Sequence, residues 1–167
     1  MKIQKSLWAM PPIEADVVYT PNWLAEDIVK WCSPCGKCLD PCKGDGAFYK
    51  YLPPHSDWCE IELGKDFFDY DDTVDWIVGN PPYSIFEDWL IHSFFLSSNV
   101  VYILPTDKVF QRMLIMDMIN KWGGIYGMRI YGGGKSLGFP FGFSFGAFHF
   151  KKDWGGKTKI DLVTWRL

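Results

Sequence analysis

Residues 75–83 of the chain read Asp75-Trp76-Ile77-Val78-Gly79-Asn80-Pro81-Pro82-Tyr83. The apolar run before Gly79 has the composition of a buried strand, and the two prolines end it because proline cannot donate to a strand ladder. Short apolar strands bounded by turn residues are typical of a parallel sheet that is covered on both faces. In such sheets ligands bind beyond the carboxyl ends of the strands, so residues 80–83 are predicted to lie in a ligand site.

The residues after this strand each have a chemical use. Asn80, held extended by the following proline, offers a side-chain carbonyl, and Pro81 offers a backbone carbonyl without a competing N–H. Two acceptors so placed suit one NH2 group, such as that of adenine, whose nitrogen lone pair is delocalised into the ring. Carbonyls that accept both hydrogens favour a pyramidal nitrogen that can attack a methyl sulfonium, and Tyr83 can stack on a flipped-out base. The alternative interpretation is a tight turn without chemistry.

Strand and helix patterns alternate on both sides of this segment. Apolar runs predict strands over 38–40, 58–63, 74–78 and 100–104, and helical spacing predicts helices over 21–31, 47–52, 85–93 and 110–122. Residues 125–131 and 143–150 read as two further strands without a helix between them. The expected fold class is therefore α/β, with a doubly wound, mostly parallel sheet and a C-terminal antiparallel hairpin that closes one sheet edge.

Upstream, residues 40–48 read as a strand, a glycine-containing turn and the start of a helix. Gly44 and Gly46 stand where a backbone must approach a ligand closely, next to Asp40, Pro41 and Phe48. This arrangement predicts a cofactor site. The alternative is an ordinary structural turn.

Acidic residues follow at positions that suit a nucleoside. Glu60 lies about twenty residues after Asp40, the separation at which an acidic side chain commonly accepts hydrogen bonds from a ribose hydroxyl, and Glu62 is the competing candidate. Asp66 could accept the amino group of a cofactor adenine while Phe67 packs on its face.

On these residues the chain resembles the amino-methyltransferases that modify adenine N6, whose hallmark is Asp/Asn-Pro-Pro followed by Tyr, Phe or Trp. Asn80-Pro81-Pro82-Tyr83 is similar to their catalytic motif, residues 40–48 to their first cofactor motif, and Glu60 and Asp66 to the second and third. Tyr19-Thr20-Pro21 is similar to the segment that contacts the methionine end of the cofactor. The resemblance spans residues 17–150 and implies a Rossmann-like methyltransferase that uses S-adenosylmethionine.

The resemblance assigns two sets of site residues. The catalytic set is Asn80, Pro81, Pro82 and Tyr83. The cofactor-binding set is Tyr19, Thr20, Pro21, Asp40, Pro41, Gly44, Gly46, Phe48, Glu60, Asp66, Phe67 and Asn80. The chain departs from the family in lacking the usual helix between the second and third strands and any target-recognition domain after the catalytic core. In this it resembles short, solitary forms carried by phages.

Four cysteines suggest a different kind of site. Cys32, Cys35, Cys38 and Cys42 have the C-x2-C-x2-C-x3-C spacing of a bacterial iron–sulfur ligand run. Gathering their sulfurs around a cluster would destroy the strand and turn at 38–42, and Lys43 stands where the ferredoxin pattern has proline. We expect no metal site and interpret the cysteines as buried or inert thiols.

Charge is distributed unevenly along the chain. Residues 1–104 carry 7 basic and 16 acidic side chains, whereas residues 105–167 carry 10 and 4. A polyanion should therefore meet the C-terminal part, with Lys108, Arg112, Lys135, Lys151 and Lys152 as the candidate nucleic-acid-binding residues. The alternative is that these cations only solvate a surface.

A run of phenylalanines precedes the last predicted strand. Phe139, Phe141, Phe143 and Phe145 alternate, whereas Phe148 and Phe150 are out of phase, which predicts a bulge near Gly146. One apolar strand face is the simpler interpretation. The other is a mobile flap over residues 135–141 that covers an extruded base.

Bulk properties narrow the class of protein. A chain of 167 residues with 48% hydrophobic content has the size of one domain. No run approaches the roughly 18 apolar residues of a membrane helix, and residues 1–10 contain no signal-peptide block, so a cytoplasmic location is expected. The oligomeric state stays open, with a homodimer as one option.

The expected activity is methylation of adenine N6 in DNA, with short or relaxed sequence specificity. RNA adenine is the nearest alternative substrate, and a protein glutamine is the next because it too carries a planar carboxamide NH2. The alternative to an enzyme is a catalytically silent module that senses the cofactor or occupies DNA. The intact Asn80 and Tyr83 argue against this alternative.

Overall fold

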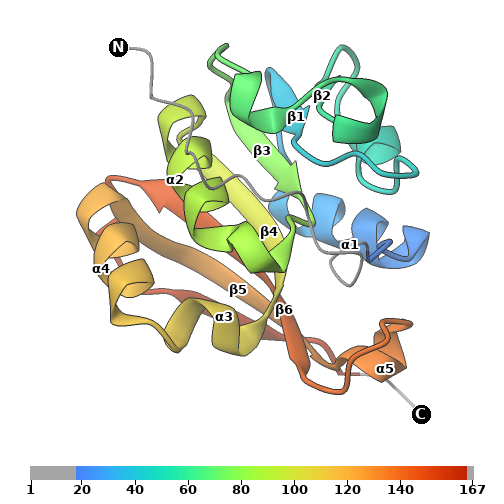
Figure 1. Cartoon of the computed structure of the whole chain (residues 1–167). Coiled ribbons are helices and arrows are strands. Elements are labelled where there is room, and N and C mark those ends of the chain that lie inside the picture. The colour runs from blue at the N-terminus through green and yellow to red at the C-terminus, as the bar shows by residue number, and fades with distance from the viewer. Residues whose placement is uncertain (1–17, 165–167) are drawn as a thin grey trace.

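A seven-stranded sheet runs through residues 18–164, the part of the chain that the computed structural model describes (Figure 1). Its strands are β1 (Cys38–Asp40), β2 (Asp57–Trp58), β3 (Trp76–Gly79), β4 (Asn99–Pro105), β5 (Gly123–Gly133), β6 (Ser144–Lys152) and β7 (Lys159–Leu162). They lie in the order β2-β1-β3-β4-β6-β5-β7. All neighbours are parallel except β6, which is antiparallel to both β4 and β5, so the expected mostly parallel sheet is confirmed.

Helices cover both faces of this sheet. They are α1 (Asn22–Cys32), α2 (Phe86–Leu96), α3 (Thr106–Phe110), α4 (Met113–Trp122) and the single turn α5 (Gly134–Leu137). Helix α1 lies on one face, and α2, α3 and α4 lie on the other (Figure 1). Accordingly Arg129 of β5 bonds Asp27 of α1, whereas Tyr102 of β4 bonds Ser93 of α2. The doubly wound arrangement is therefore confirmed.

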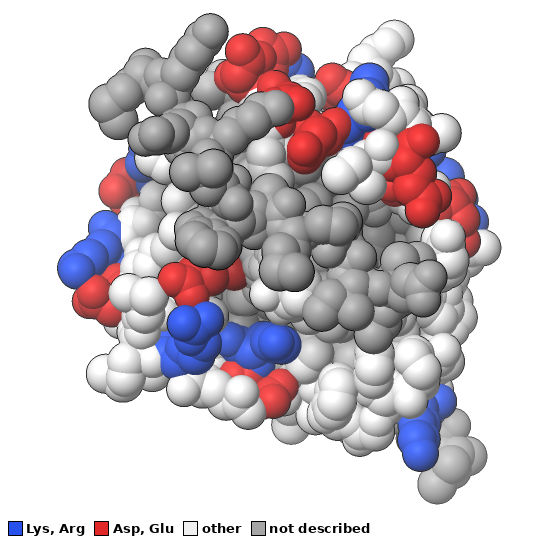
Figure 2. Space-filling view, viewed as in Figure 1, with Lys and Arg blue, Asp and Glu red and all other residues white. Residues whose placement is uncertain are grey.

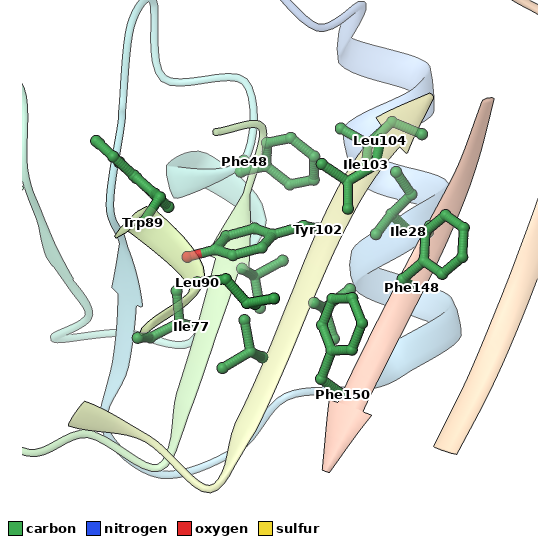
Figure 3. Close-up of a cluster of buried hydrophobic side chains, with 14 of the residues drawn as sticks. Ile28, Phe48, Ile77, Trp89, Leu90, Tyr102, Ile103, Leu104, Phe148 and Phe150 are labelled. Atoms are coloured by element: carbon green, nitrogen blue, oxygen red, sulfur yellow. The ribbon is translucent and has the colours of Figure 1, made fainter. Parts of the chain in front are cut away.

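The core lies between the central strands and the helices of each face. Figure 3 shows the side chain of Tyr102 extending from β4 toward Trp89 of α2, with the rings of Phe148 and Phe150 along β6. Tyr102, Phe148 and Phe150 are completely buried, as is Leu90 of α2. Burying a large apolar side chain contributes roughly 1.5–3 kcal/mol, so these central residues dominate the stability of the sheet.

The expected C-terminal antiparallel hairpin is confirmed as β5 and β6, but it does not form the edge of the sheet. Strand β6 returns between β4 and β5, and β7 forms the edge by pairing in parallel with β5. This position agrees with burial, because every residue from Phe145 to Phe150 is buried, and a central strand of a sheet covered by helices is buried on both faces.

Three predicted elements are wrong in extent. The helix expected over 47–52 is only a 3-10 turn at Tyr49–Tyr51, and the strand expected over 58–63 is limited to Asp57–Trp58. The helix expected over 110–122 is α4, which begins only at Met113, because Phe110 ends the preceding helix α3. Residues 1–10, for which no signal peptide is expected, lie outside the described residues. None of the helices within 18–164 has the length and apolar character needed to cross a bilayer.

The glycine- and phenylalanine-rich segment is packed rather than free. Leu137 and Phe139 are buried, and the ring of Phe139 lies 4.6 Å from that of Phe145, so the segment is not an open flap in this structure. The pairing irregularity lies in β5, between Ile130 and Gly132, opposite Gly146 and Phe145. The expected bulge thus occurs at the expected level of the sheet but on the neighbouring strand.

Candidate functional site

The turn after β1 and the end of β3 lie against each other. Strands β1 and β3 pair in parallel with Leu39 opposite Ile77, which brings the residues that follow each strand to the same edge, here called the carboxyl edge. A Cβ atom added at Gly79 would lie 3.0 Å from Pro41 Cδ and 3.2 Å from a carboxylate oxygen of Asp40. Glycine at position 79 therefore allows the two segments to approach closely.

Asn80 is held by hydrogen bonds on its side-chain amide and its backbone carbonyl. Its side-chain Nδ2 donates to the carbonyl of Val18 at 3.0 Å and to the hydroxyl of Thr20 at 3.1 Å. Its Oδ1 accepts from the hydroxyl of Tyr83 at 2.7 Å. Its backbone carbonyl accepts from the thiol of Cys42 at 2.9 Å. Asn80 thus connects the residues just before α1, the turn after β1 and the start of the 3-10 turn at Tyr83–Ile85.

Tyr83 takes a position that the sequence does not predict. Its side chain is 8% exposed, and its ring lies 6.2 Å from that of Phe145. The ring expected to stack on a target base is therefore packed inside the protein here, with its hydroxyl directed at Asn80.

Asp40 is the buried acid of the site. It is 1% exposed, and its Oδ1 accepts from the backbone N–H of Cys42 at 3.3 Å. Its Oδ2 has no hydrogen-bond partner among the described residues. Burial raises the pKa of Asp40 to about 7. A buried carboxylate oxygen left unpaired at the end of a parallel strand is an acceptor for a ligand.

Glu60 faces the glycine turn. Its carboxylate accepts from the backbone N–H of Gly44 at 2.7 Å, and Gly44 has the positive φ of 51° that favours glycine. The ring of Tyr19 lies over Gly44, because a Cβ there would be 3.4 Å from Tyr19 Cε1. Glu62, the competing candidate, is exposed. Gly44, Glu60 and Tyr19 are therefore brought together.

Two of the expected cofactor residues face the core. Phe67 is buried between Trp89, 4.5 Å away, and His92, 4.8 Å away, so its faces are covered by protein. Phe48 is likewise buried (Figure 3). Asp66 accepts from the backbone N–H of Phe68 and so shapes the turn that carries Phe67.

Two contacts of the site carry no signal in the sequence. The thiol of Cys42 donates to the Asn80 backbone, and burial raises the pKa of this thiol well above its usual range, which keeps it protonated as a donor. The backbone carbonyl of Val18 accepts from Asn80. Both depend on distant segments meeting in the fold.

The cysteines of the iron–sulfur spacing do not converge. Cys38 lies within β1, Cys42 faces Asn80, and Cys35 is exposed. Among residues 18–164 no three His, Cys, Asp or Glu side chains are grouped so as to hold a metal ion.

The candidate nucleic-acid-binding cations are divided between opposite edges of the sheet. Lys108 and Lys135 follow the carboxyl ends of β4 and β5, and Arg112 lies nearby in an ion pair with Glu87 at 2.8 Å. Lys151 and Lys152 end the antiparallel strand β6 and so lie at the amino edge, opposite Asn99 and Gly123. On the face in Figure 2, acidic side chains gather near β1 and β2, and basic ones lie beside α3 and α4.

Solved structures share this fold. No protein-family model matches the chain, and neither does any curated protein. A putative class I S-adenosylmethionine-dependent methyltransferase from Listeria monocytogenes superposes with a TM-score of 0.65 at 13% identity, covering 92% of this chain and 68% of that one. The modification subunit of a putative type I restriction enzyme from Vibrio vulnificus YJ016 gives 0.62 at 13% identity, covering 91% and 48%.

A putative RNA methyltransferase from Pyrococcus horikoshii gives a TM-score of 0.64 at 15% identity, covering 84% of this chain and 89% of that one. The chain spans about half the length of the Vibrio modification subunit. At these identities the likeness establishes the methyltransferase fold of the chain.

Proposed function

We propose that the chain transfers a methyl group from S-adenosylmethionine to the N6 amino group of adenine in DNA. The observation that carries the proposal is the position of Asn80-Pro81-Pro82-Tyr83, at the carboxyl end of β3 and against the turn that follows β1. The methyltransferase fold and the likeness to type I modification subunits support it.

The residues of the turn fit the proposed cofactor. Asp40 offers a buried carboxylate oxygen without a partner, and Gly44, which has no side chain, lets the exposed ring of Tyr19 lie close to the turn. Glu60, next to Gly44, can accept hydrogen bonds from ribose hydroxyls. When bound, S-adenosylmethionine supplies an electrophilic methyl group on a sulfonium.

Asn80 and Pro81 would position the target amino group. A carbonyl oxygen has two lone pairs, so Oδ1 of Asn80 can accept from Tyr83 and from one N6 hydrogen, while the Pro81 carbonyl accepts the other. The nitrogen lone pair then forms the new N–C bond as the S–C bond breaks, its electron pair returns to sulfur, and the amino group releases one proton to water. Alignment and electrostatics supply most of the rate, without a strong base.

Nucleic acid is favoured over protein by the cations at the carboxyl edge, and DNA is favoured over RNA by the likeness to a type I modification subunit. Lys108 and Lys135 lie at the same edge as Asn80, where they can contact phosphates flanking an extruded adenine. RNA adenine is the second candidate, because the Pyrococcus neighbour bears the name of an RNA methyltransferase. Protein glutamine lacks the phosphates that these cations would meet.

A methyl-transfer assay tests the proposal. The protein is incubated with radioactive S-adenosylmethionine and with separate pools of DNA, RNA and protein, and modified DNA is digested for identification of the methylated nucleoside. We expect label in DNA as N6-methyladenine and none with Asn80→Ala. Label mainly in RNA or protein would show that RNA or protein is the substrate instead of DNA. Cofactor binding without label in any pool would indicate a catalytically silent module.

A further inference from the structure

A pocket opens at the amino edge of the sheet, away from Asn80. Its volume is about 390 Å³, and it lies beside Trp76, the first residue of β3, whereas Asn80 follows the last. Its lining includes Trp31 of α1, Trp76 of β3, Tyr126 of β5, His149 and Lys151 of β6, and Lys159 of β7. No step of the proposed methyl transfer uses these residues.

The wall of the pocket is made of planar, uncharged rings. The Trp76 and His149 rings lie 4.9 Å apart at 39°, and the Tyr126 and His149 rings lie 4.9 Å apart. His149 also bonds Asn99 at 3.1 Å, and burial together with the charge of Lys151 lowers the pKa of His149 to about 4, so the imidazole is neutral at pH 7. His149 is itself buried next to both neighbouring rings, so the half-buried Trp76 and Tyr126 rings are the stacking surface for a planar group, and the Asn99 amide adds a polar edge.

The rim of the pocket is positive. The ammonium groups of Lys151 and Lys159 lie 5.0 Å and 4.9 Å from the centre of the Tyr126 ring, and Lys159 donates to the Tyr126 hydroxyl at 3.1 Å. Within residues 18–164 neither lysine has a carboxylate within ion-pair distance, and no acidic residue belongs to the described lining. Two unpaired cations that share one ring repel each other, and an anion between them relieves that repulsion.

We propose that this pocket binds a nucleoside phosphate, with its base on the Trp76 and Tyr126 rings and its phosphate between Lys151 and Lys159. The planar base matches the aromatic wall of the pocket, and the anionic phosphate matches its positive rim. The pocket volume lies in the range of about 300–1,000 Å³ typical of small-molecule sites. The same chemistry is offered by a free nucleotide and by one nucleotide of a single strand. The proposal does not depend on methyl transfer.

Calorimetry with thymidine probes tests it. Thymine has no exocyclic amino group, so thymidine 5′-monophosphate and the oligonucleotide (dT)6 give Asn80 no amino group to bind. Protein with excess S-adenosylhomocysteine is titrated with each probe, and with thymidine and phosphotyrosine for comparison. We expect one site per chain for at least one phosphorylated probe, an affinity that falls with salt, and no change in Asn80→Ala.

Matched variants locate the binding. Lys151→Gln/Lys159→Gln should weaken it at least tenfold, whereas Lys50→Gln/Lys121→Gln, which removes the same charge elsewhere, should change it less than twofold. Circular dichroism verifies that both variants fold. Binding of the monophosphate would show that a free nucleotide is a sufficient ligand. Binding of (dT)6 but not of the monophosphate would show that the ligand is a single strand. No binding, equal losses in both variants, or tighter binding of thymidine or phosphotyrosine than of the monophosphate would overturn the proposal.

Discussion

Asn80 has a bonded partner for its amide nitrogen, its amide oxygen and its backbone carbonyl. Asn80→Ala removes the acceptor that we assign to the target amino group, and loss of one positioned polar group costs about 3 kcal/mol of barrier, roughly a hundredfold in kcat. Affinity for S-adenosylhomocysteine should change less than about fivefold, because Asp40, Gly44 and Glu60 are untouched. Turnover kinetics and calorimetry measure the two effects, and near-normal turnover would remove Asn80 from the mechanism.

Tyr83 combines a ring and a hydroxyl whose roles can be separated. Tyr83→Phe keeps the ring but loses the 2.7 Å hydrogen bond that aligns the Asn80 amide. A hydrogen bond contributes a net 0.5–1.5 kcal/mol, roughly, so kcat should fall about tenfold or less. Tyr83→Ala should be far slower, because it also removes the buried ring that packs beside Phe145 and supports the end of the catalytic motif. Equal rates for the two variants, measured on the same DNA, would mean that the ring plays no part.

Asp40 should make the stability of the protein depend on pH. Burial raises its folded pKa to about 7 from the ordinary 3.8, so protonation favours the folded state. This contribution is fully present below pH 4 and is lost as the pH rises through 7. Asp40→Asn does not titrate, and its free energy of unfolding relative to the native chain should therefore increase between pH 4 and 8, by at most about 4 kcal/mol. Urea unfolding at both pH values measures it, and a difference independent of pH would contradict the assignment.

At the residue scale, the sequence identifies side chains whose use follows from their place in a local pattern. Asp40, Gly44 and Asn80 stand at the ends of apolar strands, where a parallel sheet exposes its ligand site. Cys42 as a donor to Asn80 is not predictable, because the contact joins residues 38 positions apart. Phe67 is predicted to pack on a cofactor adenine, and its burial is not predictable, since nothing local distinguishes it from its neighbour Phe68 and the packing of α2 decides which of them is buried.

Among the elements, α1 is connected to the far strands by a polar network. Asp27 accepts from Arg129 Nε at 2.8 Å and from the Tyr131 hydroxyl at 2.6 Å, and Arg129 also pairs with Asp161 of β7. Asp27→Ala leaves the half-buried guanidinium without this partner, so the free energy of unfolding should fall by about 2 kcal/mol. Asp161→Ala should cost less, because its side chain is 47% exposed. Urea denaturation measures the free energy of unfolding of both variants. A larger decrease for Asp161→Ala than for Asp27→Ala would contradict this ranking.

The elements that periodicity predicts well are the long ones. Helices α1 and α2 and strand β4 contain enough apolar positions to show their period and lie where expected. The turn at Tyr49–Tyr51 and strand β2 are too short to show one, and their form depends on the neighbouring turn and on Glu60. The position of β6 between β4 and β5 follows from complete burial, which a local pattern of alternating phenylalanines does not reveal.

For the molecule as a whole, the charge pattern predicts salt-sensitive DNA binding with little sequence preference. Lys108→Gln/Lys135→Gln should weaken binding to two unrelated duplexes equally and lower the slope of log K against log salt by roughly 2. Arg112 is left in place because it already pairs with Glu87. Fluorescence anisotropy measures the slopes, with Lys50→Gln/Lys121→Gln as the matched control. A preference for one duplex that disappears in the variant would show base readout by these cations.

The fold class of the whole molecule is predictable, because alternating strand and helix patterns admit few arrangements. The amino-edge pocket is not, since Trp31, Trp76, Tyr126 and His149 come from four separate elements. Nor does total charge reveal that Lys108 and Lys151 lie at opposite edges, because that depends on β6 running against its neighbours.

The insertion of β6 between β4 and β5 also constrains folding during translation. During translation β4 and β5 emerge before the strand that joins them, and the apolar edge of β4, residues 100–104, has no partner on that side until Lys152 has left the ribosome. A nascent chain in this condition presents an unpaired strand, the usual starting point for aggregation. Slow codons between β5 and β6 should therefore lower the yield of folded protein, whereas slow codons after β6 should not.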